Sequence, residues 1–454
     1  MDETGGGKMI LLTDRTGKET EYLAHSLRET CKDCTVVSVV YEGYPLKGCI
    51  SPYSSYIYGE KEYPENPRFF NQIECPEYWE ISGTGRSGLV KEFHKDRAKI
   101  YYTDPKEKRN VKIVDWLDEN GKPRFSDHYD VRGFRYAMTV LDREQKPTIK
   151  TYYTPEGEEK IVENFVTGTI MLKEGNRYSI FRNKTEFVVH FLTHSGLDIR
   201  RICINSLGIP FFVSNELGRK GYVGRDILFW QEPIYKDIPG NMQGIFRGEA
   251  TRVTKIAVQN KKSMKELMSS ATASRDIYSK LGYIYPFERR NRGSANVLIC
   301  TNSDRVLHLE ELVKNLPEYT FHVAAVTEMS SKLMDLDSYK NLKLYPCISA
   351  GKAEQLFDEC DYYLDINEGN EILSAIEKAF LHDQIIIGFT ETLHDKDLIA
   401  PENTCSEKEA EVLINTFGLI MEDPEYRKEL LSLQYEHAMC ETKESFSAFL
   451  NQLL

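Results

Sequence analysis

The pattern of apolar and polar positions divides this chain into an α/β part, a part with runs of alternating polarity, and a second stretch with the α/β pattern. Near the N-terminus, Met9-Ile-Leu-Leu-Thr13 and Val36-Val-Ser-Val-Val-Tyr41 are short, largely apolar runs. The segment between them, residues 19–30, places Tyr22, Leu23 and Leu27 on one side of a helix. Strand, helix and strand in that order predict the opening of a Rossmann-like layer with a buried parallel sheet.

From about residue 66 to residue 183, the pattern changes to short runs of alternating polarity. These runs cover residues 98–103, 111–116, 134–140, 149–153 and 168–172. Turn sequences such as Glu119-Asn-Gly-Lys-Pro123 and Pro155-Glu-Gly157 separate them. Regular spacing with such turns predicts an antiparallel β-meander.

The α/β pattern resumes at Phe187. We expect strands over residues 209–214, 227–230 and 253–259, and a helix over residues 261–281. After the polar linker Pro286–Gly293, a second α/β unit is predicted. Its expected strands are residues 296–301, 321–326, 342–345, 362–365 and 384–388, and residues from Glu425 onward are helical.

These patterns predict an α/β protein of two Rossmann-like domains with an inserted β-meander domain. The predicted boundaries are residues 1–65 and 184–290 for the first domain, 66–183 for the inserted domain, 291–424 for the second domain, and 425–454 for a helical segment that crosses back to the first domain.

Composition and charge narrow the class of protein. The chain of 454 residues has a net charge of −12, which argues against a nucleic-acid binder. It has no apolar run of membrane-spanning length and no signal peptide, so we expect a cytoplasmic location. The ten cysteines lack zinc spacing and are expected to be free thiols. No metal site and no cofactor is predicted.

The charge is unevenly distributed along the chain. Residues 86–184 carry a net charge of +5, whereas residues 291–454 carry −17. The mildly basic segment is either an ordinary solvated surface or a contact with an acidic partner or the cytoplasmic face of the membrane, as a peripheral protein.

Gly83-Thr-Gly-Arg-Ser-Gly88 has the spacing of a dinucleotide-binding fingerprint. That fingerprint joins a parallel strand to a helix, whereas the residues after Gly88 read as strands of the meander. We therefore predict a hairpin turn at this position.

Residues Asp365–Gly388 resemble the catalytic segment of a retaining sugar-nucleotide transferase of the GT-B fold, in which two glutamates stand eight positions apart. Glu368 occupies the first position, but Ile376 stands eight residues later, and Lys378 falls there when counted from the following strand. Glu377 is adjacent but rotated by about 100° on the helix. The scaffold resembles that of a GT-B transferase, whose two domains face a cleft, and no catalytic residue is predicted.

Small polar residues follow the strands of the second unit, where doubly wound sheets bind ligands. They lie in Thr301–Asp304, Thr327–Ser330, Pro346–Ser349 and Asp365–Asn370. Several could instead be helix caps: Ser303 or Asp304, Ser330 and Ser349. Between Thr327 and Gly388 there is no arginine, and the acidic residues favour a hydroxyl-rich or backbone-rich ligand over a nucleotide diphosphate.

Ten segments resemble, in order, the glycosyltransferase-stabilising (chaperone) subunit of the accessory Sec system. They are Phe70–Gln72, Trp79–Thr84, Asp127–Tyr129, Lys150–Thr154, Asn205–Phe211, Gly224–Glu232, Pro239–Met242, Thr301–Asp304, Thr327–Leu333 and Tyr363–Glu371. Histidine would be usual in that family at the position of Glu368.

The resemblance implies a heteromer with a catalytic GlcNAc-transferase subunit that modifies Ser and Thr of serine-rich repeat adhesins. It implies that this chain binds the unmodified acceptor polypeptide and transfers no sugar. The candidate acceptor-binding residues are Trp230, Gln231, Glu232, Asn302, Glu328, Asn367, Glu368 and Asn370.

Two alternatives remain open. The chain could be an active retaining GT-B glycosyltransferase that uses Glu368 with a displaced partner, or a structural scaffold whose cleft holds no ligand.

Overall fold

The computed structural model describes residues 8–31, 33–250, 252–270 and 273–452. The ends of the first and last predicted segments, residues 1–7 and 453–454, lie outside this range. Two compact units are formed: the first extends to Lys280 and also takes in Leu450, and the second runs from Leu281 to Phe449. The division falls ten residues before the predicted boundary at residue 290.

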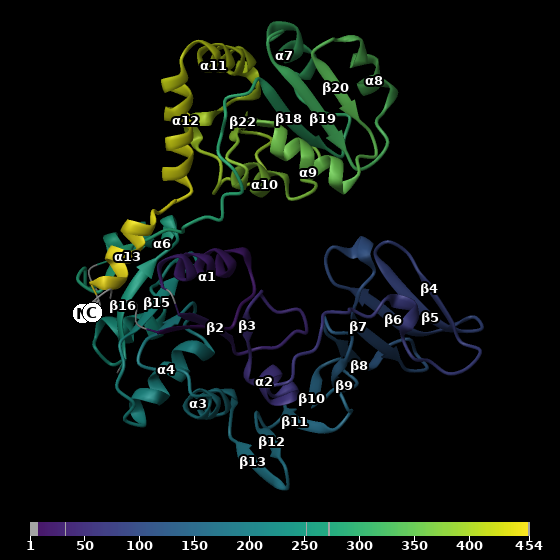
Figure 1. The fold of residues 1–454 in the computed structure, drawn as a ribbon, viewed down its shortest axis with the longest axis vertical. Coiled ribbons are helices and arrows are strands. Elements are labelled where there is room, and N and C mark those ends of the chain that lie inside the picture. Colours follow the sequence, from purple (N-terminus) through teal and green to yellow (C-terminus); the bar gives the residue numbers. More distant parts are fainter. Residues whose placement is uncertain (1–7, 32, 251, 271–272, 453–454) are drawn as a thin grey trace. The chain divides into compact units, whose positions relative to one another are not determined.

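A parallel sheet of order β17-β16-β15-β14-β1-β2-β3 forms the α/β part of the first unit (Figure 1). Its strands are β1 (Met9–Thr13), β2 (Cys34–Ser38), β3 (Cys49–Ile50), β14 (Ile202–Ile204), β15 (Asp226–Trp230), β16 (Val253–Val258) and β17 (Tyr278–Lys280). Every residue of β1, β14 and β15 is buried, as expected for strands covered on both faces.

The helices of this part are α1 (Lys18–Thr30), α2 (Pro52–Tyr58), α3 (Lys184–His194), α4 (Ile209–Arg219), α5 (Gly240–Phe246) and α6 (Lys261–Ser269). The strand predicted over residues 209–214 is wrong, because these residues begin α4. Pro210 occupies the first turn, and Phe211, Ser214 and Leu217 are buried at helical spacing. The helix predicted over residues 261–281 ends at Ser269, and β17 follows.

Ten antiparallel strands in sequential order make the meander that the sequence predicts. They are β4 (Glu80–Gly83), β5 (Ser87–Glu92), β6 (Lys95–Tyr102), β7 (Val111–Leu117), β8 (Pro123–Tyr129), β9 (Arg135–Leu141), β10 (Pro147–Tyr153), β11 (Glu159–Asn164), β12 (Ile170–Glu174) and β13 (Arg177–Phe181). The predicted hairpin turn is confirmed: Gly83 pairs with Gly88, and the Thr84 N–H donates to the Ser87 carbonyl at 2.9 Å.

Aromatic side chains join the meander to the α/β part of the same unit. The ring of Tyr53 on α2 stacks on Tyr152 of β10 at 4.5 Å between centroids, and Phe187 of α3 lies 5.2 Å from Tyr53. Both tyrosine hydroxyls donate to the buried Glu163 carboxylate at 3.2 Å. The chain therefore leaves the parallel sheet through α2 and returns through α3, and both helices pack against the inserted sheet (Figure 1).

The second unit contains a six-stranded parallel sheet of order β20-β19-β18-β21-β22-β23. Its strands are β18 (Asn296–Thr301), β19 (Thr320–Ala325), β20 (Leu342–Tyr345), β21 (Tyr362–Asp365), β22 (Ile385–Phe389) and β23 (Thr404–Cys405). The five strands predicted for this unit are confirmed. The chain order reverses between β18 and β21, so this pair forms the switch point of the sheet.

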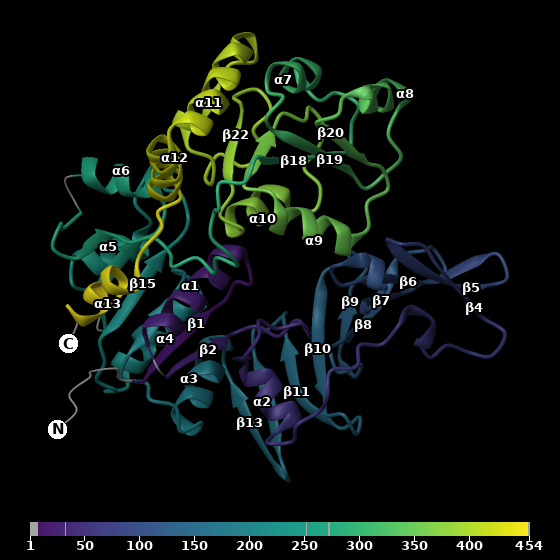
Figure 2. The ribbon, with the colours of Figure 1, turned by 45° about the horizontal axis from the view of Figure 1, so that its top comes forward.

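Helices cover both faces of this sheet. They are α7 (Leu309–Asn315), α8 (Ser331–Met334), α9 (Ala350–Glu359), α10 (Ala375–Leu381), α11 (Ala410–Glu422) and α12 (Pro424–His437). The last helix, α13 (Lys443–Asn451), follows α12 and contributes no side chain to this core. Figure 2 shows α9 and α10 side by side along one face, and side chains of α7, α11 and α12 pack in the core on the other. The predicted C-terminal helix is interrupted after His437, where Met439 adopts a positive φ of 57°.

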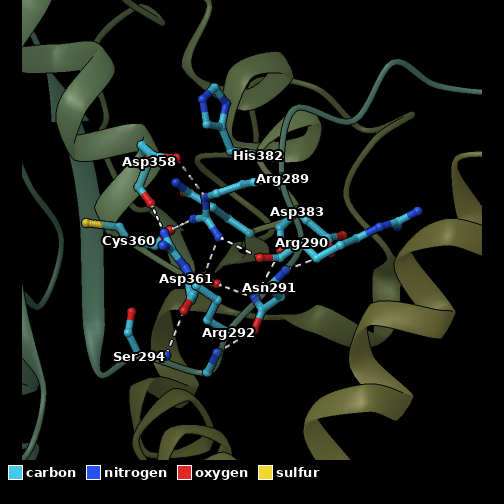
Figure 3. Close-up of polar contacts among 12 residues, drawn as sticks. Arg289, Arg290, Asn291, Arg292, Ser294, Asp358, Cys360, Asp361, His382 and Asp383 are labelled. Carbon is cyan, nitrogen blue, oxygen red and sulfur yellow. Dashed lines mark hydrogen bonds and ion pairs between the residues drawn. The ribbon is translucent and has the colours of Figure 1, made fainter.

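The predicted linker is fixed to the second unit rather than free. Arg289 donates to the buried carboxylate of Asp361 at 2.5 Å and to the Phe357 carbonyl at 3.2 Å. Asn291 donates its amide to the carbonyls of Asp361 and Asp383 at 2.9 and 3.0 Å (Figure 3). Since Asp361 and Asp383 precede β21 and β22, the linker is attached at the amino ends of two neighbouring strands.

Candidate functional site

Four predicted residues come together at the switch point of the second sheet. Asn302 directly follows β18, whereas Asn367, Glu368 and Asn370 follow β21, and the two strands are hydrogen-bonded neighbours. Parallel strands end at the same edge, so their following loops meet there. Glu328 is exposed and follows β19, on the other side of β18 from β21.

Asn367 holds this edge together from the inside. It is only 2% exposed, and its amide oxygen accepts from the Thr301 hydroxyl at 2.8 Å and from the Gly369 N–H at 3.0 Å. Its amide nitrogen donates to the Asn370 carbonyl at 3.3 Å. With these bonds made, Asn367 orders the two loops and leaves little of its side chain for a ligand.

Asn302, Glu368 and Asn370 are exposed on the same edge. Side chains pack closely on the backbone of Gly369: a Cβ added there would lie 2.0 Å from the Asn302 side-chain oxygen. The Glu368 N–H donates to the carbonyl of Arg305 at 3.1 Å. The edge therefore presents amides and backbone groups on a rigid base.

The structure adds a cation that the sequence analysis missed. The Arg305 guanidinium lies 4.0 Å from the Glu368 carboxylate, and its side chain is 74% exposed. Residues 327–388 contain no arginine, whereas Arg305 enters from the loop after β18. Its position beside the switch point follows from the strand order, which the sequence does not state.

A second missed residue is His394, in the loop after β22. Its Nδ1 lies 2.6 Å from Asp365 Oδ1, and its Nε2 lies 2.7 Å from the Gly369 carbonyl oxygen. The hydrogen bond to Asp365, opposed by burial and assisted by the Gly369 carbonyl, raises the pKa of His394 to about 9. At neutral pH this ring is a cation that pairs with a carboxylate that is 1% exposed.

Two of the three expected helix caps are present, whereas α7 begins after His308 and not at Ser303 or Asp304. Ser330 accepts from the Leu333 N–H at 3.4 Å, and Ser349 accepts from the Lys352 N–H at 3.3 Å. Both hydroxyls thus satisfy the first turns of α8 and α9.

The positions for a second catalytic carboxylate hold other side chains. Ile376 is 1% exposed in the core, and Lys378 pairs with Glu354 of α9. Glu371 accepts from the Ile376 N–H at 3.0 Å and so caps α10. This arrangement puts no carboxylate at the eighth position after Glu368.

The other three predicted residues belong to the first unit, at the carboxyl end of β15. Trp230 is 3% exposed and packs within the core of that sheet. Gln231 donates to the Glu19 carbonyl at 2.9 Å and to Gln259 at 3.2 Å. The Glu232 carboxylate pairs with Arg15. Of these three side chains, Gln231 and Glu232 reach the surface.

Within the described ranges, no group of three or more His, Cys, Asp or Glu side chains could hold a metal ion. No helix of the described residues has the length and apolar character to cross a membrane.

Family models match three consecutive parts of the chain. The GtfB middle domain matches residues 79–182, the GtfB third domain matches residues 184–269, and the GftB/GlyA-F C-terminal domain matches residues 297–434.

Two solved folds are similar at low sequence identity. The accessory secretory protein 1, 2 and 3 structure from Streptococcus pneumoniae gives a TM-score of 0.64 at 12% identity, and TarM gives 0.54 at 11%. Each match covers at least 98% of both chains. These likenesses confirm the predicted GT-B-like fold and carry nothing about function.

Relatives of higher identity cover nearly the whole chain. The UDP-N-acetylglucosamine–peptide N-acetylglucosaminyltransferase stabilizing protein GtfB of Streptococcus agalactiae is 39% identical over 443 residues, 97% of this chain and 99% of the relative. The protein of that name from Streptococcus gordonii is 38% identical and covers 95% of both chains. A chain of the GtfA/B complex bound to UDP and GlcNAc matches at a TM-score of 0.91, 38% identity and coverage of 98% and 100%. The chain therefore belongs to the GtfB family of glycosyltransferase-stabilizing proteins.

Proposed function

We propose that this chain is the non-catalytic, stabilising subunit of a two-subunit protein O-GlcNAc transferase and that it holds the acceptor polypeptide. The partner is a catalytic subunit of the GtfA kind, as in the GtfA/B complex that the chain matches. Ile376 and Lys378 in place of a second glutamate support the loss of catalysis.

The observation that carries the acceptor site is the edge formed by Asn302, Glu368 and Asn370 at the switch point. Side-chain amides offer both donors and acceptors, which suits a polypeptide backbone and serine hydroxyls. Two cations stand beside them, and each already faces a carboxylate: Arg305 faces Glu368, and His394 pairs with the buried Asp365. A diphosphate is held best by several converging cations, so this edge fits a neutral, hydrogen-bonding ligand better.

The acceptor we propose is the serine-rich repeat of an adhesin. Such a segment is disordered and loses entropy wherever it is held. A second subunit that binds it raises the effective concentration of its hydroxyls at the partner's active site. This predicts that removal of the acceptor site raises KM for the polypeptide more than it lowers kcat.

The test uses the complex with the catalytic subunit and a serine-rich peptide. Asn302→Ala combined with Asn370→Ala is expected to weaken peptide binding about tenfold, since each lost hydrogen bond contributes roughly 0.5–1.5 kcal/mol. Asn315→Ala is the matched control, because this amide lies on α7 and donates to the Glu311 carbonyl within its own helix. Unchanged affinity in the double variant would instead favour a scaffold with no ligand at this edge.

The catalytic alternative has its own test. Purified chain without its partner is incubated with UDP-GlcNAc and the same peptide, and transfer is measured. We expect none above background, and transfer that Glu368→Ala abolishes would refute the proposal.

A cytoplasmic location with peripheral contact at the membrane stays a prediction. The meander carries the basic excess between residues 86 and 184. If it docks on an anionic bilayer, the complex should sediment with phosphatidylserine vesicles and be released by salt.

A further inference from the structure

His394 joins three parts of the carboxyl edge of the second unit. It lies in the loop after β22, contacts Asp365 at the end of β21, and reaches the Gly369 carbonyl in the loop beyond. Its own backbone N–H also donates to Asp365 Oδ2 at 2.8 Å. Because Gly369 stands between Glu368 and Asn370, the ring contacts the centre of the candidate acceptor site.

Both ring contacts of His394 are made to oxygen acceptors. Only the imidazolium form has a proton on each ring nitrogen, so only the cation can donate both bonds. The charged groups around it include Asp365 from β21 and Glu371 from the loop before α10, both of which favour the cation. On the loop of His394 itself the charged residues are Glu391, Asp395, Lys396 and Asp397.

Loss of the proton leaves one ring nitrogen facing an oxygen lone pair. Asp365 is fixed on its strand, since it also holds the backbone of His394. The contact with Gly369 is the one that can open, because Gly369 belongs to a loop whose neighbours are exposed. Deprotonation would therefore remove the bond that holds the Gly369 carbonyl and loosen the loop between Glu368 and Asn370, while the bonds of Asn367 to this loop remain.

We propose that His394, as a cation, is a positioning residue that holds the loop Glu368–Asn370 in the form that binds the acceptor polypeptide. The inference rests on the proposed acceptor site and assigns that site a pH-sensitive support. Acceptor binding should then be strongest near neutral pH and should fall as the pH rises through about 9.

The experiment uses the complex with its catalytic subunit and a serine-rich peptide, with affinity measured between pH 7 and pH 10. His394→Gln should weaken binding about tenfold at pH 7, the effect of one lost charge-assisted bond. Asp365→Asn should move the alkaline loss of affinity to lower pH, because the carboxylate that favours the cation is gone. His437→Gln is the matched control, since His437 contacts the Lys396 carbonyl of the same loop at 2.9 Å without reaching Asp365.

Two further measurements do not depend on the peptide. Histidine NMR of the complex should show a ring that titrates near pH 9 and is missing in His394→Gln. Amide hydrogen exchange of Gly369 to Glu371 should quicken in His394→Gln and stay unchanged in His437→Gln.

The inference would be overturned if the His394 ring titrates near pH 6.5, or if amide exchange of Gly369 to Glu371 is unchanged in His394→Gln. The inference is also overturned if the Asn302 and Asn370 double variant binds the peptide weakly and His394→Gln binds it normally. That result would support the acceptor site and refute the role of His394. If that double variant binds normally, the acceptor site is refuted, and the NMR and exchange data still report separately on the loop.

Discussion

Strand β21 is four residues long and has a buried carboxylate at each end, and the two carboxylates are held by different kinds of cation. Asp361, just before the strand, is 0% exposed and pairs with Arg289, whereas Asp365, its last residue, is 1% exposed and pairs with His394. Arginine stays charged at every accessible pH, but histidine does not. The cation at the amino end of β21 is therefore permanent, so the attachment to the linker holds at all but acid pH, whereas the attachment at the carboxyl end can be reversed by alkaline pH.

The backbone partners follow the same division. Asp361 accepts from the Ser294 N–H at 2.6 Å (Figure 3), and Arg289 also donates to the Phe357 carbonyl. The linker is therefore attached to the amino end of β21 and to α9. Asp365 and His394 instead hold the loop that carries Glu368 and Asn370. One strand thus anchors the linker at its amino end and supports, at its carboxyl end, a loop whose attachment depends on the charge of His394.

The largest expected effect comes from removing the ion pair of Asp361 with Arg289 at the amino end of β21. Asp361→Asn leaves the nearly buried Arg289 guanidinium without its carboxylate, and such a loss costs about 3–5 kcal/mol of stability. Denaturant unfolding of the purified chain, followed by a probe in the second unit, measures it. Asp358→Asn is the control, because Asp358 is 65% exposed and lies 3.9 Å from Arg289, so it should change stability by less than about 1 kcal/mol. Equal effects of the two variants would refute the distinction.

The second effect is smaller and depends on pH. Asp365→Asn should destabilise the second unit by about 2 kcal/mol at pH 7, because a charge-assisted bond becomes a neutral one. Since the folded pKa of His394 is raised from 6.5 to about 9, its stabilisation is full below 6.5 and is lost as the pH rises through about 9. The gap between wild type and Asp365→Asn should therefore close above pH 9.

The two ends should fail at opposite extremes of pH. Burial opposes ionisation of Asp361, but its bonds from Ser294 and Arg289 together lower its pKa below 3.8. A lowered pKa contributes stability that is present above 3.8 and is lost as the pH falls through the folded value. Unfolding free energies of wild type, Asp361→Asn and Asp365→Asn between pH 2 and pH 10 test both signs. An Asp365→Asn gap that persists above pH 9 would contradict the assignment to His394.

The sequence predicts the strands of this unit better than it predicts the cations at the two ends of β21. The apolar, β-branched runs were sufficient to place β18, β19, β20, β21 and β22, because strands buried on both faces need such residues along their length. Strand-end loops then follow from the strands, so Asn302, Asn367, Glu368 and Asn370 could be predicted to lie at the same edge of the sheet. Residues 209–214 were misread, because a short apolar run fits a strand and a buried helix equally well.

The contacts of Arg305, His394 and Arg289 could not be found in the same way. His394 lies 29 positions after Asp365, and Arg289 lies 72 positions before Asp361. Only the order of strands brings these cations to the two ends of β21, and hydrophobic periodicity says nothing about that order. The burial of Trp230 in the core is also set by tertiary packing, since its place at a strand end suits an exposed or a buried ring.

The smallest expected effect concerns the carboxyl end of β21 alone. Gly369→Ala would put a methyl group 2.0 Å from the Asn302 side-chain oxygen, so Asn302 must turn away, at a cost of about 1 kcal/mol in stability. Gly351→Ala is the control, because nothing lies within 4 Å of the added Cβ in the first turn of α9, and helix propensity favours alanine by up to about 1 kcal/mol. Thermal unfolding should show a small loss for the first variant and no loss for the second. If the Asn302 amide contributes to acceptor binding, Gly369→Ala should also weaken peptide binding. The alkaline midpoint should stay near pH 9, because the substitution keeps the carbonyl of residue 369 and leaves Asp365 in place. A shift of that midpoint would mean that the shape of the loop, and not the Asp365 carboxylate, sets the charge of His394.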